Sequence, residues 1–363
     1  MFNRTLFFWR LGGLILLGSL LAWWLYGHIF DWYTSYSTII PFILFPFCFS
    51  LAHNATHKLP LKLTKLFAWV GGLWLIFTLY SFFALIVFSI LAFIFYLTHN
   101  ALLWETLAAP ISAMLGLVVL LAIGRGMWKA FHPVYRHVTI TSPKITTSYT
   151  IAFLTDLHFS PTLSHHYGKT LVRRLNQLHA DSNLIGGDLI DAHLDFVLRD
   201  GAYKALQDLT APTYAVYGNH DYFDSNIVTE KEAFSTIHFL KNEHINLQGN
   251  ITLTGLNDYL HEPTNDLMPP QAGEYNILVD HEPLRIYPAS KAGYDLYLAG
   301  HTHGGQFFPV TQITRRLFPL SYGQKQFGNL TAIVSSGYGF WGMPMRTGPS
   351  PEIVVLHFQP QKQ

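Results

Sequence analysis

The sequence has little charge for its length and a single cysteine. Asp, Glu, Lys and Arg make up 12% of the 363 residues, and the formal net charge is +1. A charge so close to zero gives no general signal for nucleic-acid binding, and no nucleic-acid partner is expected. Cys48 stands alone, which excludes a disulfide within the chain and leaves the redox compartment open. The sequence also shows no internal repeats or low-complexity tracts.

What the chain does contain is strongly divided along its length. Long uncharged apolar stretches dominate residues 1–125, whereas the rest has the composition of an ordinary globular domain. We therefore expect a helical transmembrane anchor at 1–125, a linker at 126–138 and a folded domain at 139–363. That last part is long enough to bury a substantial core.

Four apolar stretches are long enough to cross a bilayer, at about 8–27, 36–53, 66–98 and 106–124. Further spans follow the first one, which argues against a cleaved signal peptide. Residues 66–98 are ambiguous. As one helix they would be near 50 Å long, against a hydrocarbon core of about 30 Å, so one long helix and two short ones meeting near Ser81 both stay open.

Charge placement favours four spans. The connections next to Asp31 and Glu105 hold no Lys or Arg, and with four spans all the basic segments fall on one side. The positive-inside rule makes that side, and the folded domain, cytoplasmic. The middles of the spans lack ionisable Asp, Glu, Lys and Arg, which favours an anchor over a transporter. The basic residues concerned are Arg4, Arg10, Lys58, Lys62, Lys65, Arg125, Lys129 and Arg136.

Five short polar clusters in the second part each follow an apolar, strand-like run. Such runs deliver their polar residues to the carboxyl edge of buried strands, where they predict one site. The Asp, Asn and His side chains that they supply suit a divalent metal. In chain order the clusters are Asp156-Leu157-His158, Gly187-Asp188-Leu189-Ile190-Asp191, Gly218-Asn219-His220-Asp221, Asp280-His281 and Gly300-His301-Thr302-His303-Gly304-Gly305.

The segments between these clusters alternate between helical and strand patterns. Helical periodicity predicts helices over Lys169–His179, Phe196–Leu209 and Glu230–Leu240. Further strands are expected at Ile251–Leu253, Thr331–Val334 and Ile353–Phe358. This order predicts an α/β sandwich in which two mixed sheets pack together with helices outside.

The ordered set D-x-H, G-D-x-x-D, G-N-H-D, H and G-H-x-H resembles the calcineurin-like metallophosphoesterase superfamily over roughly residues 139–358. Gln306, Ser335-Ser336-Gly337-Tyr338-Gly339 and Pro344-Met345-Arg346 narrow the resemblance to its bacterial membrane-associated branch, which includes phosphodiesterases acting on UDP-diacylglucosamine. The resemblance implies a four-layer αββα sandwich. It also implies two divalent metal ions, for which Mn, Fe and Zn all suit these ligands.

The resemblance assigns a role to each cluster. It implies that Asp188 bridges two metals whose separation is about 3.5–4 Å and which activate a water. The first metal is then bound by Asp156, His158 and His303, and the second by Asn219, His281 and His301.

The resemblance further implies that His220 protonates the leaving oxygen and that Asp191 holds it, with Asp221 as the competing partner. Asp280 either orients His281 or points away from it. Arg346 either binds a substrate phosphate or forms a surface salt bridge. The adjacent His165 and His166 either reach the mouth of the site or lie in an exposed loop.

These observations predict a membrane-anchored, dinuclear, metal-dependent phosphoesterase in a bacterial inner membrane. The anchor favours an amphipathic phosphate ester as substrate, with a nucleotide-linked lipid such as UDP-diacylglucosamine as the first candidate. One alternative is a broad phosphomonoesterase or phosphodiesterase acting on soluble substrates. A second, of another class, is a non-catalytic membrane scaffold that keeps the fold.

Overall fold

The computed structural model describes residues 4–30, 36–55, 58–163, 165–222 and 233–361. The chain divides into two compact units. The first comprises Met1–Trp128 with Gly342–Pro344, and the second Lys129–Trp341 with Met345–Gln363. The predicted linker at 126–138 coincides with the end of one helix, residues 131–133 and the first half of a strand. The predicted end of the anchor at residue 125 and the predicted start of the folded domain at residue 139 remain predictions.

The first unit is helical, as the apolar stretches predict. Its elements are α1 (Arg4–Phe30), the 3₁₀ turn η2 (Tyr36–Ile39), α2 (Ile40–Asn54), α3 (Leu61–Leu97) and α4 (Ala101–Ala130). Four described helices are long and apolar enough to cross a membrane. α3 is a single helix of 37 residues that continues unbroken through Ser81, so residues 66–97 form one helix and the two-helix alternative is wrong.

Close helix contacts and local hydrogen bonds hold this unit together. A Cβ on Gly71 of α3 would lie 2.1 Å from the backbone nitrogen of Phe49 in α2, so only glycine permits this approach. Buried hydroxyls are bonded rather than orphaned: Ser50 donates to the carbonyl of Phe8 at 2.6 Å. Such pairing is needed because an unbonded polar group is costly in an apolar interior.

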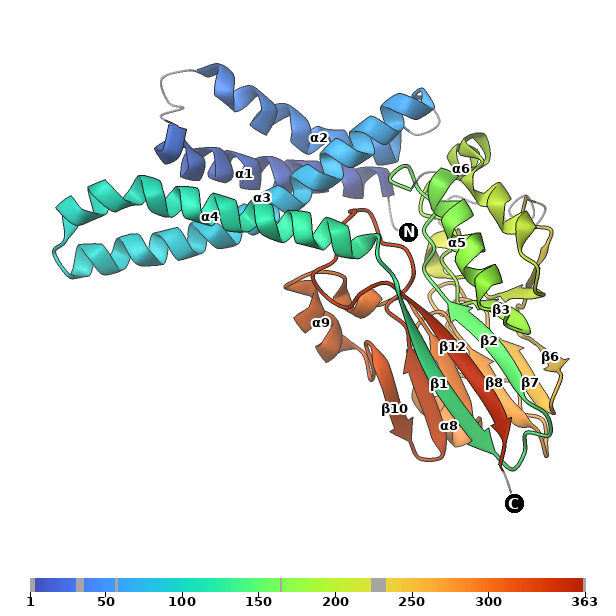
Figure 1. The fold of residues 1–363 in the computed structure, drawn as a ribbon. Helices are drawn as coiled ribbons and strands as arrows, with labels where there is room; N and C mark the ends of the chain where they lie inside the picture. The colour runs from blue at the N-terminus through green and yellow to red at the C-terminus, as the bar shows by residue number, and fades with distance from the viewer. Residues whose placement is uncertain (1–3, 31–35, 56–57, 164, 223–232, 362–363) are drawn as a thin grey trace. The chain divides into compact units, whose positions relative to one another are not determined.

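The second unit contains two six-stranded mixed sheets (Figure 1). In spatial order the first sheet is β1 (Val134–Ser142), β12 (Glu352–Pro360), β2 (Tyr149–Leu154), β3 (Ser182–Ile185), β4 (Thr213–Ala215) and β5 (Ile237–Phe239). The second is β10 (Gly323–Phe327), β11 (Leu330–Val334), β9 (Leu296–Ala299), β8 (Tyr275–Val279), β7 (Ile251–Gly255) and β6 (Glu243–Leu247). β2 to β5 run parallel, as do β11, β9, β8 and β7.

One apolar core joins the two sheets. Fully buried side chains such as Phe153 and Leu184 of the first sheet share it with Ile277 and Leu298 of the second. A second cluster lies between the second sheet and Ile286 of α8. The predicted sandwich of two mixed sheets with outer helices is confirmed. Its described helices and 3₁₀ turns are α5 (His165–Gln177), α6 (Leu194–Asp200), η3 (Ala202–Asp208), η4 (Asn219–Tyr222), α8 (Ile286–Ala292), η5 (His303–Gly305) and α9 (Val310–Leu317).

Two of the predicted helices are wrong in detail. The segment Phe196–Leu209 is not one helix, because Gly201 adopts a left-handed conformation with φ of 69° and ends α6. The segment Glu230–Leu240 begins outside the described residues and ends in β5, where Ile237 and Phe239 are buried. Pairing of β5 with β4 outweighs the helical periodicity of the isolated sequence.

Candidate metal centre

The strand order brings the predicted ligands to one place. β2, β3 and β4 are parallel neighbours in one sheet, and β8 and β9 are parallel neighbours in the other, so their carboxyl ends meet at shared edges. The polar side chains follow these ends directly. They are Asp156 and His158 after β2, Asp188 after β3, Asn219 after β4, His281 after β8, and His301 and His303 after β9.

The first group consists of Asp156, His158 and His303, all buried. The Nε2 atoms of the two histidines lie 2.9 Å apart. The Oδ1 atom of Asp156 is 3.3 Å from His303 Nε2 and 3.7 Å from His158 Nε2. Donor atoms at these separations fit the first coordination sphere of one cation with bonds of about 2.0–2.2 Å.

Asp188 connects this group with a second one, which consists of Asn219, His281 and His301. Its Oδ2 atom lies 3.7 Å from His158 Nε2 and 3.2 Å from His281 Nε2. Beside them, Nδ1 of His301 is 2.9 Å from the side-chain oxygen of Asn219. The structure thus brings all seven predicted ligands together, with the Asp188 carboxylate between the two groups.

The tautomer of His281 tests whether a cation fits here. Its Nδ1 lies 2.8 Å from the carbonyl oxygen of Gly186, which accepts only, so Nδ1 carries a proton. In the neutral ring Nε2 then presents a lone pair. This buried Nε2 makes no hydrogen bond and faces the Asp188 carboxylate. Two electron-rich atoms aimed at each other need a positive charge between them, which a proton or a metal ion supplies. Burial would lower the pKa of His281, but Asp188 raises it well above its ordinary value, so this position attracts a cation.

The electrostatics of the centre favour ligation. Burial would raise the pKa of Asp188, but the nearby imidazoles of His281 and His220 hold that pKa well below its ordinary value. Burial, aided by His281, lowers the pKa of His301 to about 4. Burial also holds the pKa of His303 well below its ordinary value. The centre therefore contains the Asp188 carboxylate together with neutral imidazoles at His301 and His303, the forms in which these side chains bind metals.

The backbone around the centre is strained. Five of the proposed ligands are non-glycine residues with positive φ, a conformation that costs free energy and concentrates at functional sites. Glycines permit close packing beside them: a Cβ on Gly218 would lie 2.2 Å from Asp188 Oδ1. This supports the interpretation that Gly218 allows its backbone to lie close to the Asp188 side chain. The five are Asp156 (57°), His158 (48°), Asp188 (53°), His301 (69°) and His303 (50°).

His220 lies beside the ligands and is held by Asp191. Its Nδ1 atom is 2.7 Å from Asp191 Oδ1, and its backbone N–H donates to Asp188 Oδ1 at 2.9 Å. Burial would lower the pKa of His220, but Asp188 and Asp191 raise it. Of the two candidate partners, the hydrogen bond goes to Asp191.

Asp221, the competing candidate, has another role. Its carboxylate accepts backbone N–H groups of Leu189 and Ile190 at 2.8 and 3.2 Å and of Gly218 at 2.8 Å. It therefore ties the loop that carries Asp188 to the loop that carries Asn219. Burial, followed by repulsion from Asp188, raises the pKa of Asp221 to about 7. Its position directly after His220 in the sequence carried no sign of this bridging.

Two open alternatives are also decided. Asp280 does not orient His281: its carboxylate pairs with Arg285 at 2.6 Å and accepts the Tyr297 hydroxyl at 2.6 Å. Arg346 forms no surface salt bridge, because it is fully buried and its Nη2 lies 3.0 Å from His303 Nδ1. It supports His303 and is not among the residues that line the cavity described below. The side chain of His166 is exposed on α5 and contacts Thr170.

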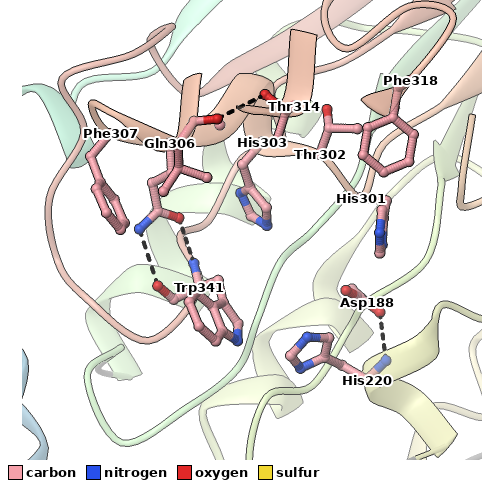
Figure 2. Close-up of a pocket in the computed structure, with 12 residues that line it drawn as sticks. Asp188, His220, His301, Thr302, His303, Gln306, Phe307, Thr314, Phe318 and Trp341 are labelled. Carbon is pink, nitrogen blue, oxygen red and sulfur yellow. Dashed lines mark hydrogen bonds between the residues drawn. The ribbon is translucent and has the colours of Figure 1, made fainter. Parts of the chain in front are cut away.

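A cavity of about 230 Å³ opens over the centre (Figure 2). Asp188, His220, His301 and His303 line its polar side. Sequence reasoning missed the apolar side, which Phe307, Val310, Phe318 and Trp341 supply. Phe307 and Phe318 flank α9 and follow the last metal-ligand cluster closely in the sequence. This closeness in sequence was the signal that could have placed them at the site. Trp341 comes from a distant loop, and no pattern in the sequence placed it here.

Comparison with known proteins decides the family. A family model described as calcineurin-like phosphoesterase matches residues 149–305. A metallophosphoesterase of Helicobacter pylori is 31% identical over 65% of this chain and 68% of its own length. The chain belongs to the calcineurin-like metallophosphoesterase family. A bovine transmembrane protein with a metallophosphoesterase domain is 32% identical over 60% of this chain and 54% of its own. A metallophosphoesterase of Campylobacter jejuni is 27% identical over 63% of this chain and 64% of its own length.

As a calcineurin-like phosphoesterase, the chain has the chemistry of a phosphoric ester hydrolase. The family typically binds two divalent metals, and the described residues include buried ligand groups suited to them. Its apolar helices, together with the bovine relative, indicate association with a membrane.

Proposed function

We propose that this protein is a membrane-anchored phosphoesterase that hydrolyses phosphodiester or diphosphate bonds at a centre of two divalent metals. The observation that carries the proposal is the convergence of six donor side chains around Asp188, with Nε2 of His281 facing its carboxylate. When bound, the two cations would acidify a water molecule and neutralise phosphate charge. Their identity is open among Mn, Fe and Zn.

The remaining residues act on the leaving group and on the geometry. His220 donates a proton to the leaving oxygen through Nε2, and Asp191 holds the orientation of its ring through Nδ1. Its raised pKa favours the protonated form that this role needs. Asp221 fixes the spacing of the Asp188 and Asn219 loops through three backbone hydrogen bonds.

The proposed substrate is an amphipathic phosphate ester at the bilayer, with a nucleotide-linked lipid such as UDP-diacylglucosamine as the first candidate. Four apolar helices and an apolar cavity wall beside the metal ligands support this choice. The unbroken α3 supports an even number of spans, which with the basic segments favours a catalytic domain in the cytoplasm of a bacterial inner-membrane protein.

The test is a substrate screen on purified full-length protein, with metal content measured on the same sample. Hydrolysis of the nucleotide-linked lipid well above that of an aryl monoester and a soluble diester is expected. Equal turnover of all three would support the broad enzyme on soluble substrates. No hydrolysis of any ester by protein carrying two metals would support the non-catalytic scaffold.

A further inference from the structure

The cavity over the metal centre has an aromatic wall whose position is set by an unusual contact. The side-chain amide of Gln306 donates to the carbonyl of Trp341 at 3.1 Å. The backbone N–H of Trp341 donates back to the Gln306 side-chain oxygen at 2.9 Å. Both bonds are drawn in Figure 2. A two-point contact to the backbone N–H and carbonyl of one residue fixes Trp341 at the cavity, which its ring lines together with those of Phe307 and Phe318.

Gln306 is itself held in a costly conformation. Its φ of 47° and ψ of −53° are unfavourable for any residue with a Cβ. Its carbonyl accepts N–H groups from Thr347 and Gly348 at 3.1 and 2.9 Å, and these bonds maintain the conformation. Strain of this kind persists where the surrounding structure imposes it, and it concentrates at ligand sites. A glycine would relieve the strain but would lose the side-chain contact to Trp341.

The hydroxyls beside the apolar side are already engaged. The Thr302 hydroxyl donates to the carbonyl of Ser321, and the Thr314 hydroxyl donates within α9 to Val310 at 3.3 Å. This wall therefore offers mainly a π-face and apolar contacts, with the indole N–H of Trp341 as a donor at the edge of its ring. Stacking of that kind accepts any flat ring, because every such ring has a π-face.

We propose that Trp341, positioned by Gln306, forms a subsite that stacks on a planar ring in the substrate group next to the scissile phosphate. The ligand class is a phosphoester or diphosphate with an aromatic or nucleobase ring in the group attached to the phosphorus. The inference rests on the proposed phosphoesterase function and adds to it the recognition element. Trp341 contacts the substrate, and Gln306 is a positioning residue.

The test compares two esters that differ only in the planarity of one ring. Methyl 2-phenylethyl phosphate and methyl 2-cyclohexylethyl phosphate have leaving alcohols of similar acidity and size. Simple hydrophobic burial favours the cyclohexyl ester, whereas stacking favours the phenyl ester. Full-length, metal-loaded protein in nanodiscs should show kcat/KM about three- to tenfold higher for the phenyl ester, the usual size of an aromatic pair effect.

Variants separate the subsite from the fold. Trp341→Leu should remove the preference for the phenyl ester, and Trp341→Phe should keep part of it. Gln306→Gly should lower the preference through KM with kcat and metal content retained, while relief of strain leaves the thermal midpoint unchanged or higher. Tyr287→Leu in α8 and Gln312→Ala in α9 change exposed side chains and are the matched controls. Both should keep the wild-type ratio of kcat/KM for the two esters.

Binding separates the failure of this inference from that of the proposed function. 3-Phenylpropylphosphonate and its cyclohexyl analogue have carbon in place of the leaving oxygen and contain no ester bond, so calorimetry measures the same ratio without turnover. If neither ester is hydrolysed, the proposed function fails, but the ratio of the two dissociation constants still decides the subsite. A ratio of one or below in the wild type, or a preference that survives Trp341→Leu, would overturn the inference.

Discussion

The two units of this protein differ in the polar side chains that they bury. Among its described residues the first unit buries no Asp, Glu, Lys or Arg, and its buried hydroxyls bond either within their own helix or to a neighbouring one. The second unit buries Asp156, Asp188, Asp280, Arg285 and Arg346 almost completely. Burial of ionised groups is costly unless each is paired or bound to a metal. The comparison teaches that apolar composition indicates membrane association for the first unit. A few buried charged side chains, whose burial costs free energy, determine the chemistry of the second unit.

The largest effect is expected where that cost is greatest, at Asp188. Asp188→Ala removes the carboxylate between the two ligand groups and leaves two cations to repel each other. Hydrolysis should fall below detection, and bound metal should fall to one ion per chain or fewer, as measured by elemental analysis. Asp195→Ala, a change of an exposed carboxylate on α6, is the matched control and should retain both metals and activity. Two metals and near-normal turnover in Asp188→Ala would show that the site is wrongly assigned.

A smaller loss is expected at His220, which acts beside the ligands. His220→Ala should retain both metals yet lower kcat by about 10²–10⁴-fold, the usual contribution of general acid–base catalysis. The loss should shrink for esters with a good leaving group, which need little protonation. Asp191→Asn should follow the same pattern more weakly. An equal loss for good and poor leaving groups would point instead to phosphate binding or damaged geometry.

Removing the first unit tests what the anchor contributes. A chain lacking residues 1–125 keeps Lys129, which bonds to the carbonyl of Gly348, and Ala130, which packs with Leu163 and Phe340. It should hydrolyse small diesters normally. On a lipid-linked substrate its activity should fall by about 10²-fold, because the anchor supplies local concentration at the bilayer. Equal activity of the short and full-length proteins on the lipid would remove the argument for a membrane substrate.

The least perturbing test concerns sidedness and should leave activity unchanged. Reporters active only inside or only outside the cell are fused after Asn100 and after Gln363. The unbroken α3 and the eight basic residues near span ends predict an external signal at Asn100 and a cytoplasmic one at Gln363. An external signal at Gln363 would exclude both the four-span arrangement and a cytoplasmic nucleotide-lipid substrate.

The sequence alone was enough for the apolar helices, the two-sheet architecture and the set of seven residues that the structure brings together. These features are local: an apolar run that ends in Asp, Asn or His defines both a buried strand and the chemistry at its end. The error at Glu230–Leu240 has a non-local cause, since a short helical pattern does not reveal that β4 offers an edge for pairing.

Only the tertiary structure decided which partner each polar group takes. Asp191 rather than Asp221 holds His220, Asp280 pairs with Arg285, Arg346 is buried against His303, and Gln306 positions Trp341 across 35 residues of chain. Except for the pair of Asp280 and Arg285, which are five residues apart, these choices depend on how distant loops meet at the edges of two sheets. A residue's type states what it can bond to, whereas the distance and direction to its partner arise from packing that no local pattern encodes.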